Sequence, residues 1–210
     1  MTPQDFIKAN AALIAPPLVP EIKLYLATEV VPLWYATEEE LSKIGVPPPY
    51  WAFAWAGGQA LARYVLDNPA TVRGLHVLDI GAGSGLVALA ASRCGAAHVL
   101  AADIDAHACA AIRLNAEANG CDIAVTGDDV IGTAGAWDVI LVGDLFYERP
   151  LAERLLAWLE PLDVPALLGD PGRNYFPKTG IEKLASYSVQ TTRDLEDREI
   201  RETGVYRLTR

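Results

Sequence analysis

The spacing of hydrophobic and polar positions changes near residue 75. Beyond that point, short continuous apolar runs alternate with segments whose apolar residues recur every three or four positions. A continuous apolar run is typical of a strand buried on both faces, and the wider spacing is typical of an amphipathic helix. The pattern therefore predicts alternating strands and helices, which build a parallel sheet with helices on both of its faces.

This reading places strands and helices at definite ranges. The predicted strands cover residues 75–80, 98–103, 122–127, 137–144 and 164–170, and the predicted helices cover 84–94, 105–119 and 150–160. Two later strands, 183–191 and 203–210, have a short connection, which predicts an antiparallel pair at one edge. We therefore expect seven strands, mostly parallel, with an antiparallel C-terminal edge strand.

Residues 1–50 have a different pattern. They contain a short predicted helix, a proline-rich link and the alternating segment EIKLYLAT. In TEEELSKIG, Thr37 precedes Glu40 by three residues, which fits a capping box, and the segment ends at Gly45. A further helix is expected over 59–67. We interpret 1–50 as an extension packed on a single domain formed by residues 51–210.

Composition is compatible with this fold. The chain has 210 residues, of which 51% are hydrophobic, as expected of one globular domain. No apolar run reaches the roughly 18 residues that a membrane span needs. The N-terminus lacks the basic start of a secretory signal, so we expect a cytoplasmic protein.

The formal net charge is −10, and Lys and Arg are scattered along the chain. Nucleic-acid binders carry a basic patch or stripe, so this composition argues against nucleic acid as a partner. The acidity favours encounter with a basic protein segment, or it serves solubility alone. The composition leaves both interpretations open.

Cysteine and histidine positions give no metal pattern. Cys94, Cys109 and Cys121 lack CxxC spacing and are expected to be reduced thiols in apolar segments. The segment DIDAH brings Asp103, Asp105 and His107 together, and these types can bind a metal. Because Asp105 also fits the N-cap of the following helix, we favour capping and expect no metal.

The segment VLDIGAGSGLVALA, residues 77–90, indicates a cofactor site. It reads as a strand, a tight turn and a helix, with glycines at Gly81, Gly83 and Gly85. The dinucleotide fingerprint GxGxxG needs its third glycine at position 86, where Leu86 stands. Acidic residues accompany the turn: they are Asp79 in the strand, Asp103 after the second strand, and Asp128 and Asp129 after the third.

This set resembles class I S-adenosylmethionine-dependent methyltransferases, which have a Rossmann-like seven-stranded sheet. The resemblance implies S-adenosylmethionine as cofactor. It assigns Gly81, Gly83 and Gly85 to the methionine part, Asp79 to the amino group, and Asp103 to the ribose. It assigns Asp128 or Asp129 to the adenine. Glycine permits the close backbone approach that such a turn needs.

Three further segments narrow the resemblance: YWAFAWAGGQALARYVLDNP, GDLFYERPLAERLLAWL and LLGDPGR. Together they are similar to the electron transfer flavoprotein β-subunit lysine methyltransferases, protein-lysine methyltransferases with a D/E-x-x-Y motif after the fourth strand. In this chain the motif is DLFY, Asp144 to Tyr147. The resemblance places both at the target amine and Trp55 over the cofactor. Ala56 replaces the proline that relatives often have after this tryptophan.

The chemistry of Asp144 and Tyr147 suits an amine acceptor. A lysine amine must be neutral to accept a methyl group, yet its ordinary pKa is about 10.4. A carboxylate at a strand end can bind and orient the incoming ammonium, and desolvation beside an aromatic ring lowers the amine pKa. Alternatively, Asp144 caps the helix near Pro150 and Tyr147 packs in the core. Asp170 and Arg173, in GDPGR, shape either the substrate cleft or a turn.

The predicted function is therefore methyl transfer from S-adenosylmethionine to lysine side chains, with the electron transfer flavoprotein β-subunit as the expected target and a monomer as the expected state. A ribosomal protein and a small-molecule amine are alternative targets. A protein that binds the cofactor without catalysis would lack Asp144. A dinucleotide oxidoreductase conflicts with Leu86.

Overall fold

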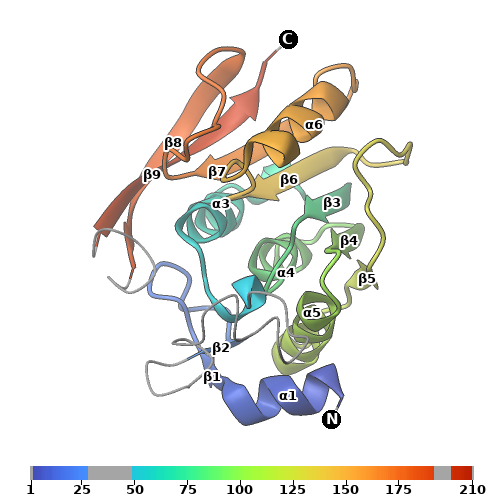
Figure 1. Ribbon diagram of the computed structural model, residues 1–210, viewed down its shortest axis with the longest axis vertical. Helices are drawn as coiled ribbons and strands as arrows, with labels where there is room; N and C mark the ends of the chain where they lie inside the picture. The colour runs from blue at the N-terminus through green and yellow to red at the C-terminus, as the bar shows by residue number, and fades with distance from the viewer. Residues whose placement is uncertain (1, 28–48, 192–199, 210) are drawn as a thin grey trace.

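The computed structural model describes residues 2–27, 49–191 and 200–209 (Figure 1). In this part of the chain, seven strands form one sheet in the order β5-β4-β3-β6-β7-β9-β8. The capping box expected at Thr37 and Glu40, with its end at Gly45, lies outside the described residues. The predicted class of fold, a mostly parallel seven-stranded sheet with antiparallel C-terminal strands, is confirmed.

The strands and helices follow the predicted ranges closely. The parallel strands are β3 (His76–Ile80), β4 (His98–Ala102), β5 (Ala124–Thr126), β6 (Val139–Gly143) and β7 (Ala166–Asp170). The helices among them are α3 (Ala56–Asp67), α4 (Leu86–Arg93), α5 (Ala106–Asn119) and α6 (Arg149–Leu159). The antiparallel strands are β8 (Ile181–Gln190) and β9 (Ile200–Leu208). Of this pair, β8 forms the edge, and the C-terminal β9 lies between β7 and β8.

Side chains alternate between the two faces of the sheet, as the strand period requires. Val77 and Leu141 pack with α3, α4 and α5, whereas Leu78 and Ile140 pack with α6 on the other face. Figure 1 shows this layering, with α6 on one side of the sheet and α3 to α5 on the other. The continuous apolar runs therefore fill two separate cores.

The described part of the N-terminal segment packs on this domain. It contains α1 (Pro3–Asn10), which has a capping box at Thr2, and the paired strands β1 (Ala12–Ile14) and β2 (Leu24–Leu26). Ile22 and Leu24 are fully buried in the core that α3 and α4 share, and α1 lies against α5. The short helices Tyr50–Ala52 and Pro69–Thr71 flank α3. A domain boundary at residue 50 stays a prediction.

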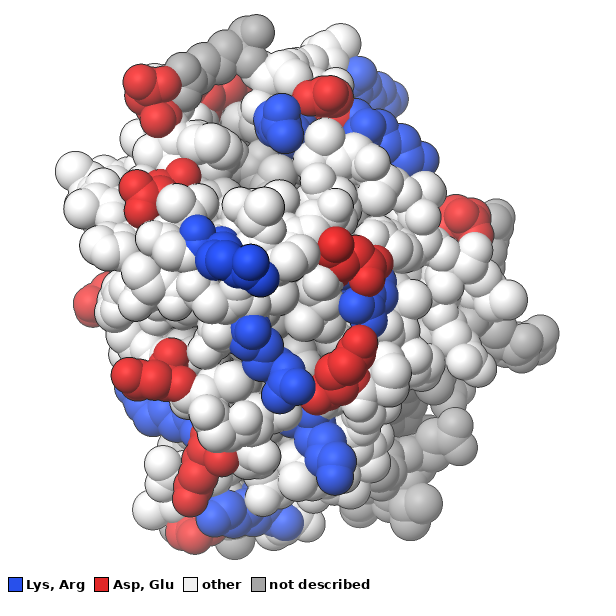
Figure 2. All heavy atoms as spheres, turned by 180° about the vertical axis from the view of Figure 1, so that it is seen from behind, with Lys and Arg blue, Asp and Glu red and all other residues white. Residues whose placement is uncertain are grey.

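Charge is mixed on the face of the molecule opposite to that of Figure 1. Figure 2 shows lysine and arginine side chains interspersed with aspartate and glutamate over this face. The formal net charge of −10 is therefore not gathered there into one acidic patch among the described residues. No helix in the described ranges is long and apolar enough to span a membrane.

Candidate active site at the strand ends

A cavity of about 840 Å³ opens at the carboxyl ends of the parallel strands. The chain order of the sheet reverses between β3 and β6, and α/β sheets bind ligands in the crevice at such a switch point. All but two of the predicted site residues line the cavity; they are Trp55, Gly81, Gly83, Asp103, Asp128, Asp129, Asp144 and Tyr147. Asp79 and Gly85 lie outside its lining.

The glycine turn between β3 and α4 has left-handed backbone conformations. The φ angles are +60° at Gly81, +53° at Gly83 and +80° at Gly85, a region that side chains disfavour. A Cβ at Gly81 would also clash with the side chain of Leu145, and one at Gly85 would lie 3.2 Å from Ile112. Gly81 and Gly83 therefore face the cavity, whereas Gly85 lets α4 pack closely on α5.

Asp79 lies behind the turn. Its Oδ2 accepts a hydrogen bond of 2.9 Å from the amide of Ala88, which satisfies a free N–H at the start of α4. The residue is 1% exposed, and this burial raises the pKa of its carboxyl to about 7.

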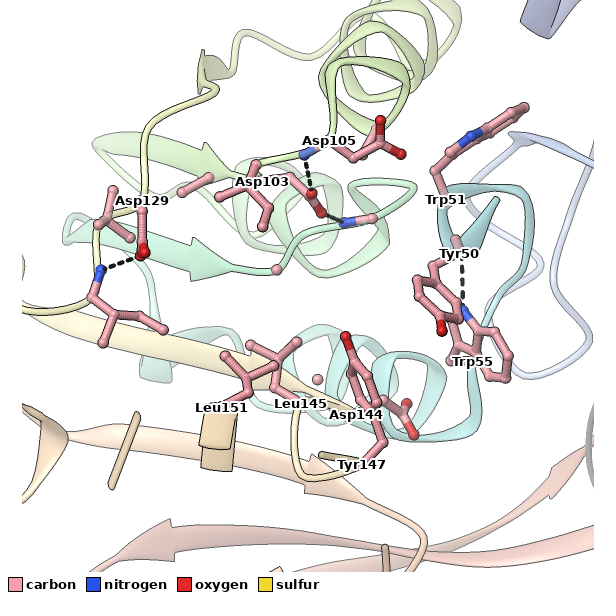
Figure 3. Close-up of a pocket in the computed structure, with 18 of the residues that line it drawn as sticks. Tyr50, Trp51, Trp55, Asp103, Asp105, Asp129, Asp144, Leu145, Tyr147 and Leu151 are labelled. Atoms are coloured by element: carbon pink, nitrogen blue, oxygen red, sulfur yellow. Dashed lines mark hydrogen bonds between the residues drawn. The ribbon is translucent and has the colours of Figure 1, made fainter. Parts of the chain in front are cut away.

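Asp103 joins the second strand to the glycine turn. Its Oδ2 accepts from the amide of Gly83 at 2.9 Å, and its Oδ1 accepts from the amide of Asp105 at 3.0 Å (Figure 3). Burial raises the pKa of Asp103, and the hydrogen bonds from the two backbone amides oppose that rise. Each carboxylate oxygen of Asp103 keeps a lone pair that can accept a hydrogen bond from a hydroxyl group of a ligand in the cavity.

These contacts also bear on the alternatives for the turn. The Gly83 amide is bonded to Asp103, and the Gly85 amide donates to the carbonyl of Ala82. A pyrophosphate cradle presents its amides to the ligand instead. Asp105 caps α5 by accepting from the amide of His107, and the described residues hold no cluster of three potential metal ligands.

Asp128 and Asp129 lie at the far end of the cavity. Asp128 accepts from the Thr126 hydroxyl at 2.8 Å, and Asp129 forms a 2.6 Å ion pair with Arg154. Figure 3 shows Asp129 at the end opposite Tyr147. Ile104 also lines the cavity and is 77% exposed. Sequence reasoning missed Ile104, although an apolar residue between two aspartates at a strand end was a usable signal.

Three aromatic rings form the other end of the cavity. The Trp55 indole donates to the carbonyl of Tyr50 at 2.9 Å. The ring of Tyr50 lies 6.0 Å from that of Trp55 and 5.8 Å from that of Tyr147, between centroids. Burial is the main cause that raises the pKa of Tyr147 to about 12. This phenol is therefore protonated at neutral pH.

Asp144 occupies a constrained position among these rings. Its φ is +56°, in the left-handed region, and only 7% of the residue is exposed. Its Oδ2 accepts from the amide of Gly58 at 3.0 Å. Asp144 therefore caps α3 from a distant strand, not the helix near Pro150, whose N-cap is Glu148. The helix α3 begins at Ala56, with Trp55 at its N-cap position, earlier than its apolar pattern predicted.

The second oxygen of Asp144 binds an arginine. Oδ1 accepts from Nε of Arg173 at 3.1 Å and from its Nη2 at 2.8 Å. The guanidinium carbon lies 5.6 Å from the centroid of the Trp55 ring. Arg173 itself lines the cavity. The turn in GDPGR thus brings a cation to the carboxylate that sequence reasoning had assigned to the acceptor amine.

The residues of the cavity fit S-adenosylmethionine. Asp103 offers hydrogen-bond acceptors for ribose hydroxyls, Ile104 offers an apolar surface for a base, and Gly81 and Gly83 offer bare backbone. Carboxylates and aromatic faces also suit the positive charge of a sulfonium. These acceptors and surfaces lie on several separate elements, and the sheet brings them together.

Comparison with known proteins agrees with this chemistry. A family model described as ribosomal protein L11 methyltransferase (PrmA) matches residues 59–143. The electron transfer flavoprotein beta subunit lysine methyltransferase of Xenopus laevis is 39% identical over 97% of this chain and 86% of its own length. The protein of that name from Homo sapiens is 40% identical over 82% of this chain and 68% of its own length.

Solved structures share the same fold. A ribosomal protein L11 methylase from Lactobacillus delbrueckii subsp. bulgaricus matches with a TM-score of 0.52 and 25% identity, over 74% of this chain and 79% of its own. Magnesium protoporphyrin IX methyltransferase from Synechocystis PCC 6803, solved with S-adenosylmethionine bound, matches with a TM-score of 0.55 and 16% identity, over 73% and 80%. The second likeness concerns the fold alone.

Proposed function

The chain belongs to the electron transfer flavoprotein beta subunit lysine methyltransferases, and we propose that it methylates lysine side chains of such a beta subunit. It is an S-adenosylmethionine-dependent protein-lysine methyltransferase. The observation that supports the target is the similarity to the Xenopus laevis protein along nearly the whole chain. The matched length, 97% of the chain, extends well beyond the cofactor half.

The cofactor half of the cavity would hold S-adenosylmethionine, which supplies a methyl group on a positively charged sulfur. In this proposal Gly81 and Gly83 line its methionine part, and Asp103 accepts from the ribose hydroxyls. Asp128 or Asp129 serves the adenine. Trp55 covers the methyl end. Gly85 and Asp79 act from behind the turn, by positioning α4.

The acceptor half would receive the lysine side chain. Asp144 and Tyr147 stand at the aromatic end of the cavity, where a lysine entering from solvent meets little water and several rings. Desolvation there lowers the pKa of the amine and favours its neutral, nucleophilic form. Because Tyr147 keeps its proton, it contributes a ring wall and a hydroxyl donor, not a base. Positioning of the amine then supplies much of the rate.

A ribosomal protein is the second candidate target. The match of residues 59–143 to the ribosomal protein L11 methyltransferase family supports it, as does the L11 methylase structure. Both matches support a target less strongly than does the similarity to the Xenopus laevis protein, which extends along nearly the whole chain. The family match covers mainly the half of the domain that binds the cofactor.

Mass spectrometry tests the target directly. Purified electron transfer flavoprotein beta subunit and purified ribosomal proteins are incubated separately with the enzyme and S-adenosylmethionine. We expect mass gains in methyl units, located on lysines, in the flavoprotein subunit. Gains only in ribosomal proteins would replace the target and keep the chemistry. No gain in either, with S-adenosylhomocysteine still bound, would refute both proposed targets.

Two further expectations belong to this proposal. The protein acts as a monomer, which light scattering of the purified enzyme tests. It works in the cytoplasm, where the free thiols of Cys94, Cys109 and Cys121 stay reduced. Cell fractionation followed by immunodetection tests the compartment.

A further inference from the structure

The acceptor end of the cavity contains a cation-binding subsite built from the protein's own residues. The carboxylate of Asp144 holds the guanidinium of Arg173, which lies 5.6 Å from the centroid of the Trp55 ring, and the ring of Tyr50 packs against those of Trp55 and Tyr147. A buried carboxylate next to aromatic faces is the environment that proteins use to bind ammonium and guanidinium groups. In this structure the group in the subsite is the guanidinium of Arg173.

The guanidinium of Arg173 is held closely in this subsite. Two of its nitrogens donate to Oδ1 of Asp144, and the amide of Gly58 donates to Oδ2. The side chains of Arg173 and Asp144 are 17% and 9% exposed. An acceptor ammonium that reached Asp144 with Arg173 in place would put two cations on one buried carboxylate, which like-charge repulsion disfavours. An exchange of one cation for the other keeps the carboxylate compensated.

A second carboxylate stands ready for the displaced arginine. Asp170 ends β7, one strand away from Asp144, and lies in the same turn as Arg173, whose amide donates to its Oδ1 at 2.7 Å. Its Oδ2 is buried and has no hydrogen-bond partner among the described residues. Burial raises the pKa of Asp170 to about 7 and the charge of Asp144 adds to the rise, while hydrogen bonds from the amides of Arg173 and Gly172 and the charge of Arg173 oppose it.

We propose that Arg173 is a specificity-determining residue that occupies the acceptor subsite until the substrate lysine displaces its guanidinium from Asp144 toward Asp170. Free amines in solution compete with this tethered cation only at high concentration, roughly millimolar. A lysine presented by a docked protein competes with the added affinity of the rest of its surface. Occupation of the subsite by Arg173 thus favours lysines presented by a docked protein over free amines. The inference rests on the proposed lysine transfer but not on the identity of the target protein.

Steady-state kinetics gives the first test. Arg173→Met removes the cation and keeps the unbranched stem over Trp55. We expect the KM for the flavoprotein subunit to fall about tenfold, the change that a charged hydrogen bond of roughly 1.4 kcal/mol represents. A KM that rises or stays the same would overturn displacement, because it would make Arg173 a fixed wall of the site. Arg173→Lys, which keeps a tethered cation, should lie nearer to the native enzyme.

Arg149 provides a matched control. Its guanidinium lies 5.6 Å from the ring of Tyr175, outside the cavity lining. Arg149→Met therefore removes an arginine from an aromatic face without touching the subsite, and its KM should stay within about twofold of the native value. Binding of S-adenosylhomocysteine, measured by calorimetry, verifies that each variant is folded.

Asp170 is tested by a double-mutant cycle. Asp170→Asn removes the second anion, so we expect the KM to rise in the native background and to stay unchanged in the Arg173→Met background. Equal effects in both backgrounds would mean that Asp170 does not act through Arg173 and would refute its role as receiving carboxylate.

A measurement on the unmutated protein does not depend on variants that fold or on the target. With S-adenosylhomocysteine bound, the Nε–H resonance of Arg173 is followed by NMR while N-acetyl-lysine methylamide is added at millimolar concentration. We expect the resonance to shift and its exchange protection to fall, and the norleucine analogue to have no effect. An unchanged resonance at saturating amide would overturn displacement. A shift with no methylation of the flavoprotein would discard the target and keep this inference.

Discussion

The backbones of Gly57 and Gly169 touch where the start of α3 crosses the end of β7. A Cβ on either glycine would clash with the carbonyl oxygen of the other. Beside them, a Cβ on Gly143 would lie 3.1 Å from the Cα of Gly58. Only bare backbone permits this approach, and the approach brings the amide of Gly58 to the carboxylate of Asp144. The WAGG segment at 55–58 and the two GD segments, at 143–144 and 169–170, are therefore parts of one contact.

This contact predicts opposite effects of two neighbouring substitutions. Gly57→Ala forces α3 away from the sheet and should lower the free energy of unfolding by about 3 kcal/mol. A Cβ at Gly58 meets nothing within 4 Å, so Gly58→Ala should raise it by about 0.5 kcal/mol. Urea denaturation of both variants measures the two changes. Equal effects of the two alanines would contradict the packing.

Asp103 should control cofactor affinity through the turn. Asp103→Ala removes the acceptor of the Gly83 amide and the proposed acceptor for the ribose, so S-adenosylhomocysteine should bind at least about tenfold more weakly. Calorimetry measures the dissociation constant. Asp103→Asn keeps one acceptor oxygen, so its dissociation constant should lie between those of the native protein and Asp103→Ala. If Asp103→Ala binds as well as the native protein, the residue is no cofactor ligand.

Stability should fall as pH rises toward neutrality. Asp79 and Asp170 each have a folded pKa of about 7, mainly because of burial, while the unfolded value is about 4. Between these values the folded state binds more protons, so the free energy of unfolding falls with pH, by at most about 1.4 kcal/mol per unit for each group. The decline starts above pH 4 and levels off once the pH exceeds the folded pKa.

Asp170→Asn isolates one of these two contributions. Its oxygen can still accept from the amides of Gly172 and Arg173, but it has no charge to bury. The slope between pH 4 and 7 should therefore decrease, and the stability of the variant relative to the native protein should be greater at pH 8 than at pH 4. Chemical denaturation at a series of pH values measures both quantities. An unaltered slope would show that Asp170 does not titrate in this range.

Tyr147 should contribute its ring more than its hydroxyl. Because its pKa is raised to about 12, no ionisation of this phenol enters the rate between pH 7 and 10. Tyr147→Phe should keep the shape of the pH–rate profile and lose less than about tenfold in kcat/KM. Tyr147→Ala opens the wall that faces Tyr50 and should lose more. A profile that loses a limb in Tyr147→Phe would make the phenol a proton acceptor.

Asp144 should be required for transfer but not for cofactor binding. Asparagine adopts left-handed backbone readily and still accepts from Gly58, whereas alanine at a φ of +56° adds strain of about 1 kcal/mol. Both variants should lose methyl transfer, and Asp144→Ala should also lower the melting temperature. S-adenosylhomocysteine should bind both within a few-fold of the native affinity. Loss of that binding would make Asp144 a structural residue instead.

The sequence by itself determined the order and type of the strands and helices from residue 75 onward. Apolar runs and helical periods are local signals, and the buried sheet preserves them because each run fills one of the two cores. It also carried the resemblance that implies the cofactor class, since the glycine turn and the acids at the strand ends are adjacent in the chain to the elements that present them. Most of these residues line one cavity.

Tertiary structure alone decided what those residues touch. Asp79 was predicted to reach the cofactor directly or through water, and the structure adds that its carboxyl accepts from the amide of Ala88 behind the turn. Asp144 was predicted to face the acceptor amine, and the structure adds that Arg173, 29 residues away in the chain, donates to its Oδ1. Side-chain partners depend on distances between elements that sequence spacing does not encode. The position of β9 between β7 and β8 and the early start of α3 have the same cause, because both depend on contacts made only when the sheet is complete.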